Sequence, residues 1–195
     1  MNKRIDIKDI RRRELINATR LVVAREGFET TTVAKIAAEA GFSIGFMHHH
    51  FRNKDALLAE TMRVVYGDMA KLISARLCKT TNAEQRLRII LEGNFDPEIY
   101  TKANALIWVS FVPRVAFNAE FTRLQTVIER RTYSNIASAI RPIAPDANIA
   151  PKVVEVETLI NGYWLRLGLH PDRKDNLRQE ALEQIARYSA ALTQP

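Results

Sequence analysis

Residue types that can contact DNA are concentrated in one stretch of this 195-residue chain, between positions 30 and 57. Thr32 can cap a short amphipathic helix, because its hydroxyl can accept a hydrogen bond from a free backbone N–H at the helix start. Gly41 can take the positive φ that ends such a helix, and Ser43 can cap a second helix that runs to about His50. Two short helices joined by a tight turn predict a helix-turn-helix, whose second helix enters the major groove of DNA.

The second helix carries the residues expected to read the DNA. The residues that it presents to the groove are Ile44, Gly45, Phe46, His48 and His49. An apolar side chain can meet the methyl group of thymine, a histidine can contact a base edge or a phosphate, and a glycine lets the backbone come close. Together with the capping residues Thr32 and Ser43, these five form the core of a predicted DNA-binding surface.

Three consecutive histidines, His48, His49 and His50, raise the question of a metal site. Successive residues on a helix point about 100° apart, so these imidazoles cannot converge on one ion as an i, i+4 pair can. We therefore expect no metal site, and the sequence predicts no cofactor.

The flanks of the motif indicate a protein family. Upstream lies a long amphipathic helix, and six basic residues fall within the first thirteen positions: Lys3, Arg4, Lys8, Arg11, Arg12 and Arg13. Downstream, residues 51–57 provide an aromatic anchor, a basic turn and a new helix start. Four features occur in order, with h for an apolar residue: T-h-x-x-I-A, A-G-h-S, H-F and N-K-x-x-L. This arrangement resembles the three-helix head of the TetR family of transcriptional regulators.

The resemblance implies a helix-turn-helix DNA-binding domain at residues 1–52, followed by a helical ligand-binding and dimerisation domain at residues 53–195. It also implies that Lys54 reaches a backbone phosphate, aided by the dipole at the start of its helix. Many members carry a tyrosine where this chain has His48, so His48 would have to make that tyrosine's phosphate contact. Two such heads would bind a palindromic double-stranded DNA operator, since one head reads only a few base pairs.

The composition is consistent with such a protein and excludes some other classes. Hydrophobic residues make up 47% of the chain and charged residues 26%, values typical of a soluble globular protein. No apolar run approaches the ~20 residues needed to cross a bilayer, so we expect a cytoplasmic protein without a membrane partner. The single cysteine, Cys78, cannot form an intrachain disulfide, which suits a reducing compartment. The net charge of +7 favours a polyanionic partner.

Apolar residues keep helical spacing along the rest of the chain, and no run is typical of a strand, so the predicted fold class is all-α. Pro113 must end or kink the helix that precedes it, because proline cannot donate a backbone hydrogen bond. The family resemblance sets two body helices, 118–140 and 152–169, against a second subunit, which predicts a homodimer. Beyond the motif, helices are expected over residues 7–26, 53–78, 83–95, 96–112, 118–140, 152–169 and 173–192.

Aromatic residues of the body indicate the chemistry of a small-molecule effector. The sequences GNFD, RLQ and NGYWLR, which begin at positions 93, 123 and 161, are similar to those of choline-responsive TetR-family repressors of glycine-betaine synthesis. This similarity implies choline or betaine aldehyde as effector, and aromatic faces hold such a quaternary ammonium. Asn161 stands where an acid is expected, which removes a possible counter-charge. The expected ligand-binding residues are Phe95, Trp108, Phe111, Phe117, Asn161 and Trp164.

Functions of other classes stay open at this point. A helical enzyme would need an acid–base pair such as Glu92 with Asp96, or His170 with Asp172, but no nucleophile–base–orienter set accompanies either pair. An interaction scaffold that has lost DNA binding would be consistent with the missing tyrosine at His48. Within the leading class, a TetR-type repressor that senses an unrelated apolar or cationic ligand is the alternative to a choline sensor.

Overall fold

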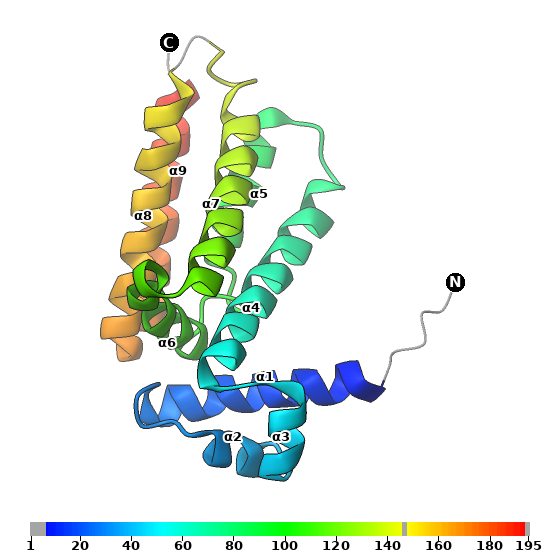
Figure 1. Cartoon of the computed structure of the whole chain (residues 1–195). Coiled ribbons are helices and arrows are strands. Elements are labelled where there is room, and N and C mark those ends of the chain that lie inside the picture. The colour runs from blue at the N-terminus through cyan, green and yellow to red at the C-terminus, as the bar shows by residue number, and fades with distance from the viewer. Residues whose placement is uncertain (1–6, 146–147, 194–195) are drawn as a thin grey trace.

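Helices form the regular secondary structure of the computed structural model, which describes residues 7–145 and 148–193 (Figure 1). No strand occurs in these residues, and the all-α prediction is confirmed. Of the predicted basic N-terminus, Lys3, Arg4 and the side chain of Lys8 lie outside the described part. The helices are α1 (Ile7–Glu26), α2 (Val33–Glu39), α3 (Ile44–His50), α4 (Lys54–Leu77), α5 (Ala83–Gly93), α6 (Lys102–Phe111), η1 (Val112–Phe117), α7 (Ala119–Ile140), α8 (Ile149–Leu169), η2 (Pro171–Arg173) and α9 (Lys174–Thr193).

The head is built from α1, α2 and α3 around a small apolar core. In Figure 1, α2 and α3 lie on one side of α1 and the body helices lie on the other. This arrangement sets α3 on the outer side of the head. The buried side chains of the head core are Leu15, Ile16, Ala18, Val22, Ile36, Ala37, Met47, Phe51 and Leu57.

The end of α1 packs directly against the body. Val23 and Phe28 belong to a second buried cluster, whose other members come from α4, α6 and α7. The predicted boundary between residues 52 and 53 is therefore crossed by apolar packing, although the boundary itself stays a prediction. The body members of this cluster are Leu58, Ala59, Met62, Ile107, Phe111, Phe121, Leu124 and Ile128.

The long helix α4 connects the head to the body, as the sequence predicted. It starts at Lys54 because the side-chain oxygen of Asn53 accepts a hydrogen bond from Ala56 N at 2.8 Å. The start of α6 differs from the prediction. The sequence placed its start at residue 96, but the Thr101 hydroxyl caps it by accepting from Asn104 N at 3.2 Å. Residues 96–101 instead form a turn, which contains Tyr100 and brings it into the core.

Pro113 and Pro151 border body helices and act in different ways. α6 ends at Phe111 and a 3-10 helix carrying Pro113 follows it, so the predicted break is confirmed. Pro151 lies in the first turn of α8, where a missing N–H leaves no helical bond unmade. For this reason α8 begins at Ile149, three residues before the predicted start.

A third buried cluster joins α5, α6, α7, α8 and α9 into the body core. Close helix approach there depends on glycine. A Cβ on Gly168 of α8 would lie 2.5 Å from Val109 Cγ2 of α6, so only glycine leaves room for this contact. Among the described residues, no helix is long and apolar enough to cross a membrane.

Candidate DNA-binding head and effector cavity

The turn between α2 and α3 has the geometry of a helix-turn-helix. The Thr32 hydroxyl accepts a hydrogen bond from Lys35 N at 3.2 Å, and the Ser43 hydroxyl accepts from Phe46 N at 3.1 Å. Gly41 has a φ of 71°, and the Phe42 N–H closes the turn on Ala37 O at 2.8 Å. Both predicted caps and the predicted glycine turn are therefore present.

Helix α3 divides its residues between the core of the head and the solvent. Met47 is fully buried, while Ile44 is 50% exposed and Gly45, His48 and His49 are exposed. These four predicted residues lie on the outer surface of the head, where they can reach a DNA groove.

The predicted base-contacting residue Phe46 lies in a different environment. Its ring is 4.5 Å from the ring of Phe42 and 4.5 Å from that of His50, between centroids. The Arg11 guanidinium lies 5.5 Å from the same ring. Phe46 is therefore half-buried in the structure and helps to hold α3 in place, whatever its contact with DNA.

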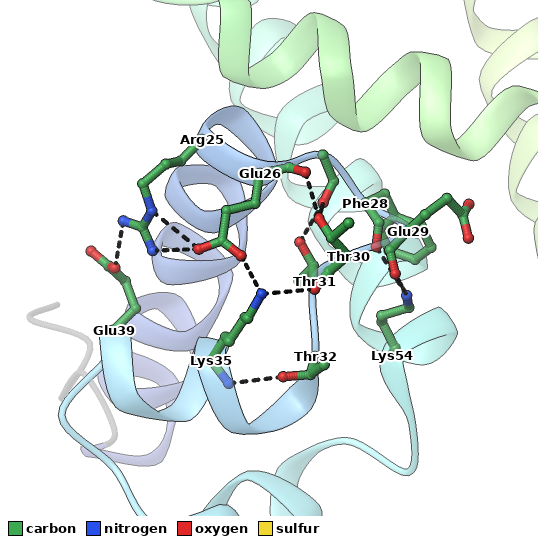
Figure 2. Close-up of polar contacts among 11 residues, drawn as sticks. Arg25, Glu26, Phe28, Glu29, Thr30, Thr31, Thr32, Lys35, Glu39 and Lys54 are labelled. Carbon is green, nitrogen blue, oxygen red and sulfur yellow. Dashed lines mark hydrogen bonds and ion pairs between the residues drawn. The ribbon is translucent and has the colours of Figure 1, made fainter.

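Lys54 connects the start of α4 to the segment between α1 and α2 (Figure 2). Its Nζ donates hydrogen bonds to Phe28 O at 2.9 Å and Glu29 O at 3.4 Å, and lies 4.3 Å from the centroid of the Phe28 ring. An ammonium group has three N–H donors, so one remains for a phosphate. The phosphate contact of Lys54 stays a prediction.

A network of charged side chains fastens α1 to α2 in the same view (Figure 2). Arg25 of α1 bonds to Glu39 of α2 at 2.9 Å, while Lys35 of α2 pairs with Glu26 of α1. The hydrogen bond from Lys35 lowers the pKa of the Glu26 carboxyl. This network complements the apolar core of the head and fixes the position of α2 relative to α1.

The body contains a small cavity of about 30 Å³, enclosed by α4, the segment between α5 and α6, α6 and α8. Of the predicted ligand-binding residues, Trp108, Asn161 and Trp164 line this cavity. The fold therefore brings Trp108 of α6 beside Asn161 and Trp164, which lie one turn apart on α8.

The other three predicted ligand-binding residues do not line the cavity. Phe95 is fully buried against Tyr100, and Phe111 stacks on Phe121 with ring centroids 4.9 Å apart. Phe117 is 92% exposed, because the 3-10 helix after Pro113 turns it outward. The first two are core residues and the third is a surface residue of the described protomer.

Several cavity residues were missed from the sequence. Tyr66 comes from α4 and Asn94 follows α5, and both lie beside the two tryptophans. The Asn94 Nδ2 donates to Ile90 O at 2.9 Å. Burial raises the pKa of the Tyr66 hydroxyl, and nearby negative charge adds to the effect. Apolar periodicity along α4 was the available signal, since Met62, Val65, Tyr66 and Met69 share one face.

No group of three or more histidine, cysteine, aspartate or glutamate side chains that could hold an ion occurs in the described part of the chain. His48 and His49 point to solvent from separate positions on α3.

A capped helix-turn-helix on a three-helix head, joined by a long helix to a helical body with an aromatic cavity, defines a DNA-binding transcriptional regulator. The chain matches "Bacterial regulatory proteins, tetR family" over residues 15–61 and "BetI-type transcriptional repressor, C-terminal" over residues 83–194. It therefore belongs to the TetR family and has a BetI-type C-terminal domain. It is a transcriptional repressor of this type and not an enzyme.

Similar proteins agree with this assignment. The HTH-type transcriptional regulator BetI of Escherichia coli K12 is 34% identical over 181 residues, which cover 92% of this chain and 93% of the relative. Its counterpart from Yersinia pestis is 33% identical over 187 residues, covering 95% and 93%.

Solved structures show the same fold. A putative regulator from Pseudomonas aeruginosa PAO1 has a TM-score of 0.80 and 26% identity, covering 97% of this chain and 93% of its own. A putative regulator from Saccharomonospora viridis, solved in complex with choline, has a TM-score of 0.76 and 22% identity, covering 90% and 95%.

Proposed function

We propose that the protein is a cytoplasmic homodimeric repressor that holds a palindromic operator, and that a small quaternary ammonium ligand in the body changes its affinity for that operator. Choline or betaine aldehyde is the proposed effector, and the genes for conversion of choline to glycine betaine are the proposed targets. The observation that carries the ligand assignment is the pair Trp108 and Trp164 on one cavity, because tryptophan faces are the best aromatic partners of a cation.

The relatives support this choice of ligand. The C-terminal half matches a BetI-type repressor domain, and a protein of the same fold was solved with choline bound. An unrelated apolar or cationic effector remains the alternative, since the cavity walls also contain methionine and isoleucine side chains.

The size of the cavity supports a coupling between ligand and DNA. Ligand pockets generally hold about 300–1,000 Å³, far more than the about 30 Å³ present here. A ligand that fills this cavity must therefore displace wall side chains, most of which belong to α4, α6 and α8. Because α4 begins beside the head and α6 packs on α1, such a movement reaches the DNA-binding surface.

The surface of α8 supports a dimer. Val154, Leu165 and Leu169 are large apolar residues that the protomer leaves exposed, at spacings that set them on one side of the helix. Tyr133 is exposed on α7 on the side that faces α8, whereas the exposed Val127 lines a different groove beside α4. Contact between these surfaces of two copies would cover them and would hold two heads for the two half-sites of an operator.

The decisive experiment is a titration of the purified protein onto DNA from upstream of its own coding sequence, with and without choline. Specific binding with a steep dependence on salt, and a shift of affinity in choline, are the expected results. Binding no tighter than to a scrambled duplex would contradict the operator assignment. If millimolar choline and betaine aldehyde do not change operator binding, the repressor assignment stands and the proposed effector is wrong.

A further inference from the structure

A groove between α7 and α8 continues the effector cavity toward the surface. The groove has a volume of about 450 Å³ and lies directly behind the cavity wall. The residues that line both spaces are Tyr66, Asn94, Ile160 and Asn161. A ligand in the cavity is therefore separated from the groove by single side chains.

Two carboxylates line this groove, and neither makes an ion pair with another described residue. Glu129 of α7 accepts a hydrogen bond from Gln125 Nε2 at 2.9 Å, and Glu157 of α8 has no such partner among the described residues. Arg130 also lines the groove but bonds to neither carboxylate. Burial raises the pKa of Glu157, and the negative charge of Glu129 raises it further, so the two groups lie within electrostatic reach of each other.

The groove also contains a buried polar atom without a partner in the described structure. Gln125 Oε1 is buried and has no hydrogen-bond partner, while Nε2 of the same amide donates to Glu129. Asn94, on the wall that groove and cavity share, is 8% exposed and uses its Nδ2 on Ile90 O. Buried polar atoms are normally satisfied, so a ligand or water is expected to complete this site.

We propose that Glu129 and Glu157 supply the counter-charge of the effector site, so that it accepts a small quaternary ammonium monocation and rejects a zwitterion that carries the same ammonium together with a carboxylate. The inference rests on the proposed function, because it concerns the ligand of that cavity. It also accounts for Asn161. Glu157 precedes Asn161 by one helical turn and therefore supplies an acid on the same side of α8.

The absence of N–H groups in a quaternary ammonium explains why nearby carboxylates matter for its binding. A quaternary ammonium has no N–H, so hydrogen bonds cannot hold it, and only aromatic faces and an electric field can. Trp108 and Trp164 supply the aromatic faces. A carboxylate beside a partly dry cavity attracts a cation more strongly than it would in water, and it does so without direct contact. The carboxylate of a zwitterion meets repulsion from the same two groups.

The test measures calorimetric binding of three probes whose bulky head groups have nearly the same shape. Choline is the monocation, 3,3-dimethylbutan-1-ol is its uncharged carbon analogue, and glycine betaine is the zwitterion. The full-length protein is expected to bind choline at least about tenfold more tightly than either of the others, as expected for a field that acts on charge. Each of Glu129→Gln and Glu157→Gln should weaken choline at least about fivefold and leave the uncharged alcohol unchanged.

Glu155→Gln is the matched control, because Glu155 lies on the same helix and pairs with Lys152 at 3.3 Å, away from the groove. It should leave all three affinities as they are, and circular dichroism should show every variant folded. Choline binding that both glutamine variants retain in full would overturn the counter-charge and leave the effector cavity standing. Absence of binding by all three probes would overturn both proposals together.

Discussion

Lys54 and Arg114 both hold a positive charge over the ring of Phe28, with Lys54 Nζ 4.3 Å and Arg114 Cζ 4.5 Å from its centroid. Lys54 opens α4, and Arg114 lies in the 3-10 helix that follows α6. Glu29, the next residue, pairs with Arg114 through its carboxylate and accepts from Lys54 through its carbonyl. The Arg114 hydrogen bond lowers the pKa of Glu29. The start of α4 and the 3-10 helix η1 thus contact the head at the same two residues, Phe28 and Glu29.

Replacement of Lys54 by alanine tests the predicted phosphate contact. We expect Lys54→Ala to weaken binding to all DNA sequences by a similar factor and to flatten the log–log salt slope by about one unit, as loss of one phosphate contact does. Anisotropy titrations at several salt concentrations measure both. Arg114→Gln serves as the control, because Arg114 also contacts the Phe28 ring but is not part of the predicted DNA-binding surface. If the salt slope of Lys54→Ala is unchanged, Lys54 does not contact a phosphate and only stabilises the segment between α1 and α2.

Two residues of α3 should respond differently to truncation. His49→Ala removes an exposed side chain, so it should change the preference among operator variants and leave thermal stability unchanged. Phe46→Ala removes a ring packed on Phe42 and His50, so it should also lower the melting temperature. Competition binding and differential scanning calorimetry separate the two effects. A stable Phe46→Ala protein with altered preference would make Phe46 a pure base contact.

Tryptophan fluorescence should report ligand binding with no contribution from tryptophans elsewhere in the chain. The chain has two tryptophans and both line the cavity, so the whole signal originates there. Choline should quench it, and Trp108→Ala should cost at least about 1 kcal/mol of choline binding as a lost cation–π contact. Trp108→Phe should keep part of the affinity. Equal choline affinity in Trp108→Ala and the wild type would place the ligand elsewhere.

A charge on the outer side of α8 should separate the subunits. Leu165 is 44% exposed in the protomer, so Leu165→Glu should yield a folded monomer by sedimentation. Ile160 is 6% exposed and lines the cavity, so a charge there should unfold the protomer instead. Ala75→Glu, on the exposed side of α4, should leave the dimer intact. A dimeric Leu165→Glu protein would move the interface away from this surface.

Glu157 should lower the stability of the free protein at neutral pH. Its pKa in the folded state is raised above the ordinary 4.5, so stability falls as the pH rises from 4.5, and the loss is complete once the pH exceeds the raised value. Glu157→Gln should therefore raise the melting temperature at pH 7, and the gain should disappear when the pH falls below 4.5, where the unfolded carboxyl is also protonated. Glu155→Gln should show no such gain. A lower melting temperature for Glu157→Gln at pH 7 would contradict the burial of this charge.

Structural features that depend on one or a few neighbouring residues were predictable from the sequence. Caps and turns depend on single residues, so Thr32, Gly41 and Ser43 sufficed to define the helix-turn-helix. The predicted start of α6 at residue 96 was wrong, because residues 96–101 form a turn and the Thr101 hydroxyl caps the helix.

The cavity was only half predictable, because it depends on how distant helices face one another. Trp108 and Trp164 stood out by their chemistry, whereas Tyr66 looked like any aromatic on the apolar side of α4. Phe117 was chosen by its aromatic ring, but it ends the 3-10 helix that contains Pro113 and is exposed there. The sequence indicated position 161 as the place of a counter-charge. Glu157, one turn earlier, could not be recognised from the sequence, because only the fold places Glu129 of α7 in the same groove.

The ion pairs and buried core that join α1 to α2 leave the head no easy way to change shape internally. Any movement that reaches it through α4 or through Phe28 must carry all three helices together. In a dimer, each head then keeps its own base contacts while the distance between the two heads changes. In the proposed ligand-controlled dimer, the DNA sequence that each head recognises would therefore stay constant, and a ligand would select only among spacings of the half-sites.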